Sequence, residues 1–160
     1  GEHRAQVAAE VGPRAAVPSL QPVIGGEPAA GLHQGAYVLD EDANNQPEVI
    51  LIASGSEVHI ALKAAELIKA KGPATRVVSM PSWELFEAQP ADYRQQVLPP
   101  RVKAKVAVEA GSPQGWHRYV GDAGRVVGLD HFGASAPAQT LFEKFRLTSD
   151  QVVEKALECV

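Results

Sequence analysis

The segment of residues 47–73, PEVILIASGSEVHIALKAAELIKAKGP, constrains the fold more strongly than any other part of the chain. Its first apolar run, residues 49–53, is continuous and rich in β-branched side chains, as is typical of a strand buried on both faces of a parallel sheet. From Val58 onward, apolar residues recur at three- and four-residue steps, which places them along one face of a helix. Gly72 and Pro73 end that helix. The segment therefore predicts a strand, a tight turn and a helix that packs on the sheet.

Strand and helix signals alternate through the rest of the chain. Further strands are predicted at residues 74–80, 102–109 and 125–130. Helical segments are predicted after Ser82, at residues 91–98, within residues 111–124, from Ser135 and after Thr148. This alternation of buried strands with helices is typical of an α/β protein with a parallel sheet.

The last helix has the clearest start. Thr148 and Gln151 match a capping box, and Leu147 and Val152 stand at the positions of a hydrophobic staple. The predicted buried stripe of this helix consists of Val152, Val153, Ala156, Leu157 and Val160.

A short strand at residues 37–39 precedes the segment described first. The loop of residues 41–46 that joins the two is too short to contain a parallel crossover. We therefore expect residues 37–39 to form a hairpin with residues 49–53, at the edge of the sheet. The predicted fold is a three-layer α/β sandwich with a mixed sheet of about five strands, four parallel and one antiparallel edge strand.

The chain has 160 residues, which suits one domain, here residues 31–160. Residues 1–30 are rich in Ala, Pro and Gly and are expected to form a flexible leader.

A net charge of -4 argues against nucleic acid and anionic membrane as partners. The single cysteine, Cys159, leaves no disulfide framework, and no apolar run approaches the ~20 residues of a membrane helix. The sequence therefore predicts a cytoplasmic protein.

Ligands in such sheets gather beyond the carboxyl ends of the strands. At the first of these ends, Ser56 is expected to cap the helix, and Glu57 favours the positive end of the helix dipole. Free N–H groups in the turn make a phosphate or another small anion a possible ligand of Ser54, Gly55, Ser56 and Glu57. Two capping hydroxyls alone also explain the pattern. A serine hydrolase is disfavoured because the turn lacks the G-x-S-x-G sequence.

A second group of candidates follows the later strands. Asp130 with His131 is the best acid–base pair, although helix capping or contact with a neighbouring subunit also explains it. Aromatic side chains flank the same loops, and such residues favour an interface. The predicted interface residues are Trp83, Trp116, His117, Asp130, His131 and Phe132. The histidines show no metal-ligand spacing, and we expect no metal or cofactor site in this chain.

Several longer motifs occur in order along residues 34–160. They are QGAYVL (34–39), ILIASGSEV (50–58), RVVSMPSWELF (76–86), YRQQVLPP (93–100), VAVEAG (106–111), GWHRYVG (115–121), FGASAP (132–137) and LFEKF (141–145). Together these motifs resemble the C-terminal domain of bacterial transketolases. Residues 1–30 do not follow the family.

The resemblance implies a domain of the enzyme that transfers two-carbon ketol units between sugar phosphates in the pentose phosphate pathway. Thiamine diphosphate and a divalent cation, magnesium or calcium, are held in that family by upstream domains, so no catalytic residue is assigned here. In that family a Gly-Asp-Gly motif is followed by paired asparagines, and together they hold the metal ion. The nearest match in this sequence is Gly-Asp-Ala-Gly at residues 121–124, and the paired asparagines, Asn44 and Asn45, precede it instead of following it. The implied role is subunit packing or regulation.

The implied partners are the upstream domains or a second copy in a homodimer. Loss of the upstream domains is expected to leave aromatic surface near Trp83, Trp116 and Phe132 uncovered. The alternative hypothesis is a free-standing α/β module that binds a small anionic effector at the helix start of residues 55–57.

Overall fold

The computed structural model describes residues 31–42, 46–128 and 147–160. In these residues one five-stranded sheet has the order β1-β3-β2-β4-β5. The strands are β1 (Tyr37–Glu41), β2 (Val49–Ala53), β3 (Thr75–Ser79), β4 (Ala104–Val108) and β5 (Arg125–Val127). β2, β3, β4 and β5 are parallel, and β1 is antiparallel at the edge. The predicted sheet composition is therefore confirmed.

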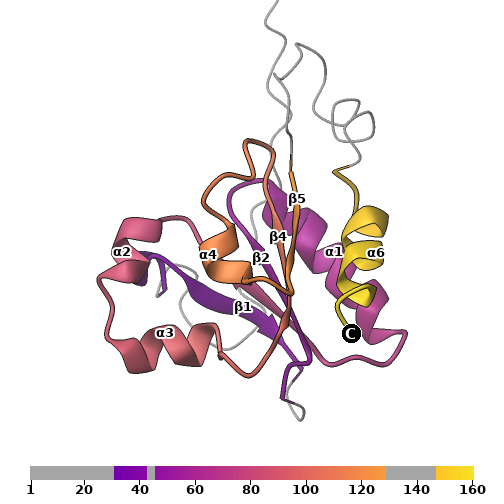
Figure 1. The fold of residues 1–160 in the computed structure, drawn as a ribbon, viewed down its shortest axis with the longest axis horizontal. Helices are drawn as coiled ribbons and strands as arrows, with labels where there is room; N and C mark the ends of the chain where they lie inside the picture. Colours follow the sequence, from indigo (N-terminus) through magenta and orange to yellow (C-terminus); the bar gives the residue numbers. More distant parts are fainter. Residues whose placement is uncertain (1–30, 43–45, 129–146) are drawn as a thin grey trace, which may run out of the picture.

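Helices cover both faces of this sheet. They are η1 (Leu32–Gln34), α1 (Glu57–Lys69), α2 (Trp83–Glu87), α3 (Ala91–Val97), α4 (His117–Val120) and α6 (Ser149–Leu157). Figure 1 shows α1 and α6 on one face, and α2, α3 and α4 on the other. The three-layer α/β sandwich is confirmed. The predicted helix from Ser135 and residues 1–30 lie outside the described residues.

β2 forms the centre of the core. Val49, Leu51 and Ala53 pack with residues of α1 and α6, whereas Ile50 and Ile52 pack with residues of α2 and α4 on the opposite face. Successive strand side chains point to opposite faces, so both faces of β2 are apolar because both are covered. The expectation of a strand buried on both sides is confirmed.

The predicted hairpin between β1 and β2 is wrong. β1 pairs with β3, with Tyr37 opposite Ser79 and Glu41 opposite Arg76. β2 lies between β3 and β4, and both of its hydrogen-bonding edges are occupied by parallel neighbours. Residues 42–48 can span about 20 Å when extended, whereas a step across one intervening strand is about 10 Å. The short loop excluded a parallel crossover, but it did not require the two strands to be adjacent.

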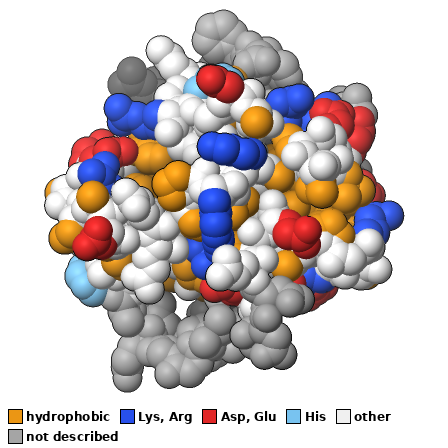
Figure 2. Space-filling model, turned by 60° about the horizontal axis from the view of Figure 1, so that its bottom comes forward, with side chains coloured by type: hydrophobic (Ala, Val, Ile, Leu, Met, Phe, Trp, Pro, Cys, Tyr) orange, Lys and Arg blue, Asp and Glu red, His pale blue; other side chains and the backbone are white. Residues whose placement is uncertain are grey.

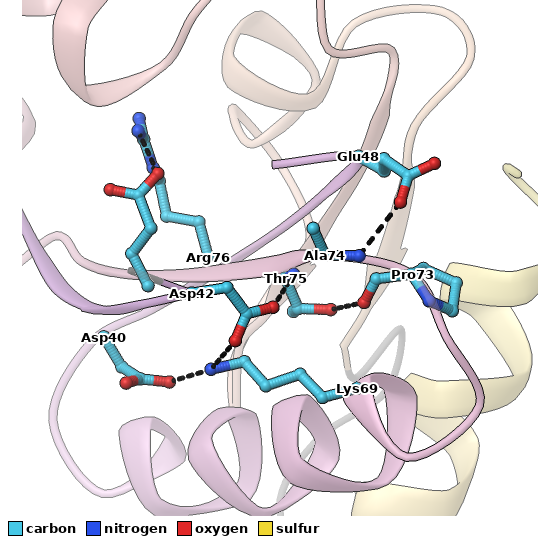
Figure 3. Close-up of polar contacts among 9 residues, drawn as sticks. Asp40, Asp42, Glu48, Lys69, Pro73, Ala74, Thr75 and Arg76 are labelled. Carbon is cyan, nitrogen blue, oxygen red and sulfur yellow. Dashed lines mark hydrogen bonds and ion pairs between the residues drawn. The ribbon is translucent and has the colours of Figure 1, made fainter. Parts of the chain in front are cut away.

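Polar contacts hold β1 on β3 near the amino end of β3 (Figure 3). The Lys69 ammonium of α1 lies 2.8 Å from Asp40 Oδ2 and 3.1 Å from Asp42 Oδ1. Asp42 also accepts a hydrogen bond from the Thr75 backbone N–H, at 3.1 Å. Burial lowers the pKa of Lys69, but the hydrogen bonds to both aspartates outweigh burial and raise this pKa above its ordinary value. The lysine therefore stays charged and links α1 to the edge strand.

The start of α6 is confirmed in part. Thr148 Oγ1 accepts a hydrogen bond from the Gln151 backbone N–H, at 3.3 Å, as an N-cap residue does. The Gln151 side chain donates to Glu154 instead of returning to Thr148, so only half of the capping box forms.

Leu157 and Val160 are exposed, contrary to the predicted buried stripe of this helix. Leu157 lies about 100° around the helix from Ala156, and Val160 lies beyond the helix end.

Candidate functional site

The carboxyl ends of the parallel strands meet at the upper edge of the sheet in Figure 1. The structure brings two of the predicted loops together there, the turn after β2 and the loop after β4. Asp130, His131 and Phe132 of the predicted interface lie outside the described residues. The candidate site is therefore built from the first two loops and the aromatic side chains that support them.

The turn after β2 differs from its predicted geometry. Gly55 adopts a left-handed backbone conformation, with φ +56°. Ser56 already has helical backbone angles, φ -68° and ψ -25°, and its side chain caps no backbone N–H group. A capping residue needs an extended backbone so that its side chain can turn back to the first helical turn. The predicted N-cap role of Ser56 is wrong, because its hydroxyl donates instead to Glu57 Oε1, at 3.0 Å.

Glu57 is buried, with 7% of the residue exposed. Burial raises the pKa of Glu57, and the nearby charge of Glu109 raises it further, while hydrogen bonds from its own backbone N–H and from Ser56 oppose the increase. A second negative charge brought to this turn would meet the Glu57 carboxyl at close range. Anion binding at Ser54, Gly55, Ser56 and Glu57 stays a prediction, and these two carboxyl groups weaken it.

Glu109 connects the end of β4 to the aromatic side chains. Its Oε1 accepts a hydrogen bond from Gly111 N–H at 3.0 Å, and its Oε2 accepts one from Trp116 Nε1–H at 3.2 Å. A carboxylate directly after an inner strand, with a glycine two residues later, is the sequence signal for such a turn. The partner Trp116 had no comparable local signal, because it reaches Glu109 only after the chain folds back.

The aromatic residues form a cluster of Trp83, Phe86, Trp116 and Tyr119, named here the aromatic cluster. The rings of Trp83 and Trp116 are 5.1 Å apart and nearly perpendicular, which is a favourable arrangement. Trp116 is only 1% exposed and Trp83 is partly buried, so the expectation of uncovered aromatic surface at Trp116 is wrong. His117, by contrast, is exposed.

Gly115 explains why these rings pack on one another. Its φ is +89°, and a Cβ atom added there would come within 2.7 Å of the Trp83 ring. Glycine adopts this conformation without strain and leaves room for the ring. The rings therefore cover one another inside the domain instead of facing outward.

The site combines the buried Glu57 carboxyl, whose pKa is raised, with Glu109, which the aromatic cluster contacts through the Trp116 hydrogen bond. Among the described residues, no three side chains of His, Cys, Asp or Glu lie together in a way that could hold a metal ion. None of the helices in the described ranges is both long enough and apolar enough to span a bilayer.

We predict that Glu57 makes stability depend on pH. The folded protein holds the Glu57 proton more tightly than the unfolded chain does, since its pKa is raised. The resulting stabilisation is complete below the ordinary pKa of glutamate and is lost as the pH rises through the raised pKa. Glu57→Gln keeps the shape of the side chain without the charge, so its stability relative to the native protein should increase as the pH rises above the ordinary pKa of glutamate, about 4.

Urea unfolding at a series of pH values measures this difference. Glu66→Gln is the control, because Glu66 is an exposed residue of the same helix, and this variant should follow the native curve. Equal pH dependence of the native protein and Glu57→Gln would contradict the prediction.

Comparison with known proteins identifies the family. Residues 35–148 match the family model described as the transketolase-like TK C-terminal domain. Transketolase 2 of Vibrio parahaemolyticus is 51% identical over 132 residues, which are 82% of this chain and 20% of the relative. The chloroplastic transketolase of Solanum tuberosum is 46% identical over 136 residues, 84% of this chain and 18% of the relative. The chain thus spans about a fifth of the length of these curated relatives.

Solved structures agree with this result. The transketolase from Leishmania mexicana has a TM-score of 0.73 and 43% identity, covering 81% of this chain and 18% of that one. A split gene transketolase, described as an inactive beta4 tetramer, has a TM-score of 0.63 and 27% identity, covering 91% of this chain and 47% of that one. The motifs, the fold and the family match agree, and the chain belongs to the transketolase-like C-terminal domain family.

Proposed function

We propose that this C-terminal domain supports the assembly of a thiamine-diphosphate-dependent transketolase of the pentose phosphate pathway, and has no active site of its own. The observation that carries the proposal is the continuous family match over residues 35–148, which corresponds to only about a fifth of each complete relative. In this proposal the other four fifths of the complete enzyme bind the cofactor, the divalent cation and the sugar phosphates.

Within the described residues, the side chains around Asp122 do not fit the metal ion that accompanies the diphosphate. Asp122, in the Gly-Asp-Ala-Gly stretch, lines a pocket together with Lys103, Lys105 and Arg118, and these positive charges disfavour a divalent cation. Magnesium on a diphosphate needs oxygen ligands from the protein, and lysine and arginine supply none. We therefore derive no catalytic step for this domain.

The proposed partners are the catalytic domains of a transketolase and a second copy in a homodimer. The split gene transketolase supports this proposal, because that relative is described as inactive in its tetramer of one chain type. The single cysteine favours a reducing compartment, which we propose to be the cytoplasm. The alternative of an effector module at residues 55–57 is disfavoured by the buried Glu57 carboxyl.

A domain exchange tests this proposal. We expect that residues 31–160 can replace the C-terminal domain of the Vibrio parahaemolyticus transketolase 2, since the two sequences are 51% identical over 132 residues. The chimera should assemble as the parent does and keep kcat/KM within about tenfold of it. The same exchange with the domain of the Mycobacterium leprae transketolase is the control. A folded chimera that fails to assemble, beside an active control, would contradict a role in assembly.

A further inference from the structure

A pocket of about 720 Å³ lies at the amino ends of β4 and β5, away from the candidate site at their carboxyl ends. Its wall is formed by α3, α4 and the loops that precede the two strands. Figure 2 brings this side of the molecule forward and shows basic side chains along the middle of the face. The volume falls within the range of about 300–1,000 Å³ that is usual for small-molecule sites.

The lining of this pocket combines an apolar part with an excess of positive charge. The apolar part includes Phe86, Leu98 and Val120. The charged side chains are Glu87, Arg94, Lys103, Lys105, Arg118 and Asp122. Basic groups outnumber acidic ones, although the whole chain has a net charge of -4. The pocket therefore attracts anions that the rest of the surface repels.

Three of the basic side chains pair with no carboxylate in the part of the chain that the structure describes. Arg94 pairs with Glu87 at 3.2 Å, whereas Lys103, Lys105 and Arg118 form no ion pair with any described residue. Lys105 is only 7% exposed, and its ammonium donates a hydrogen bond to the Val102 carbonyl oxygen. Burial lowers the pKa of Lys105, and the charge of Lys103 lowers it further. A buried ammonium without a counter-ion is costly, and a bound anion would remove that cost.

A further donor in the pocket wall lacks an acceptor. Arg94 Nε is buried and forms no hydrogen bond within the described residues. The Tyr119 hydroxyl is also buried, and burial, followed by contact of the hydroxyl with the Glu87 carboxylate, raises the pKa of Tyr119 to about 12, so it keeps its proton. Buried polar groups in proteins nearly always have a partner. The cations and the Arg94 N–H group therefore call for a ligand that carries several acceptor oxygens and negative charge.

We propose that this pocket binds a small organic phosphate. Lys103, Lys105 and Arg118 would neutralise the phosphate dianion, and the organic part would lie against Phe86 and Leu98. A phosphate group matches the three unpaired cations better than a single carboxylate does, because it carries more charge and more acceptor oxygens. This inference is independent of the proposed role in assembly, because it concerns a different edge of the sheet.

Titration of the full 160-residue chain by NMR tests the proposal, with phenyl phosphate and inorganic phosphate as probes at low ionic strength. Phenyl phosphate should bind more tightly than inorganic phosphate and should shift the amide signals of residues 118–123 in a saturable manner. Lys103→Ala and Arg118→Ala should each weaken binding about tenfold or more, as expected for a lost charged hydrogen bond. Arg118→Lys should retain most of the affinity.

Matched variants separate this site from general charge attraction. Lys103 and Arg118 are exposed, so their alanine variants should fold, which circular dichroism checks. Lys63→Ala, on the opposite face in α1, should bind as the native chain does. Equal affinity in the native chain, Lys103→Ala and Arg118→Ala would overturn the site, and equal affinity for both probes would overturn the organic ligand. Two results together would overturn the proposal: neither probe binds saturably, and the native chain self-associates whereas Arg118→Ala does not. They would show that a protein partner occupies the pocket instead.

Discussion

Replacement of Arg76 by alanine is expected to lower the free energy of unfolding by about 3–5 kcal/mol, the usual loss when one partner of a buried ion pair is removed. The Arg76 guanidinium donates to Glu41 Oε1 from Nη2, at 2.5 Å, and from Nε, at 3.1 Å. It also donates to the backbone carbonyls of Gln96, at 2.7 Å, and Val97, at 2.9 Å. Its side chain is 10% exposed. The variant would therefore leave a carboxylate and two carbonyls without their donor.

Urea unfolding followed by tryptophan fluorescence measures this loss. Arg125→Ala is the matched control, because Arg125 lies 3.7 Å from Glu158 and its side chain is 44% exposed. Such an exposed pair contributes little to stability, because water and salt screen it. Arg76→Lys should recover little, because an ammonium cannot reproduce the forked contacts of a guanidinium. Equal losses in Arg76→Ala and Arg125→Ala would show that the contacts between β1, β3 and α3 do not stabilise the domain.

Gly35→Ala is expected to destabilise the domain by about 2–5 kcal/mol, from backbone strain and steric overlap together. Gly35 has φ +81°, and an added Cβ would lie 2.3 Å from Phe86 N and 2.4 Å from Ser82 O. Both neighbours are backbone atoms, one in α2 and one in its N-cap residue, so no side-chain rotation can relieve the contact. The glycine also accepts a hydrogen bond on its carbonyl from Ser82 N–H, at 3.0 Å. Larger residues here would push α2 away from the chain before β1.

Gly72→Ala separates the two contributions to that loss. Gly72 also has a positive φ, +119°, but nothing lies within 4 Å of a Cβ added there. Its alanine variant should therefore show the conformational cost alone, about 1–2 kcal/mol. Thermal unfolding of both variants gives the difference. A loss in Gly35→Ala no larger than that in Gly72→Ala would mean that α2 moves freely and the close contact has no cost.

The elements of the fold could be predicted because their signals are local. The apolar run of β2, the helical spacing of α1 and the caps of α2 and α6 depend on neighbours a few residues apart. Ser82 Oγ, for example, accepts from Leu85 N–H as its position before the helix predicts. The position of β1 could not be predicted in this way, because Asp42, Lys69 and Thr75 are far apart in sequence and meet only in the folded sheet.

The candidate site could be located but not described from the sequence. The rule that ligands gather at the carboxyl ends of parallel strands selects the loops after β2 and β4. It does not reveal that Glu57 is buried beside Glu109, because that depends on the adjacency of two strands about fifty residues apart. The burial of Trp116 likewise depends on Trp83 lying against Gly115, which has no sequence periodicity. Exposure of aromatic residues could not be inferred from their positions near loops.

The central proposal is that this domain assists a transketolase and does not itself hold the cofactor. Isothermal titration calorimetry of the purified 160-residue chain with thiamine diphosphate and magnesium, paired with a coupled assay of ketol transfer, tests it most directly. A complete transketolase serves as the positive control for both measurements. We predict neither magnesium-dependent binding of the cofactor nor turnover, because Asp122 lies among basic side chains and cannot hold the metal ion. Micromolar binding of thiamine diphosphate that requires magnesium, or turnover by the chain alone, would contradict the proposal.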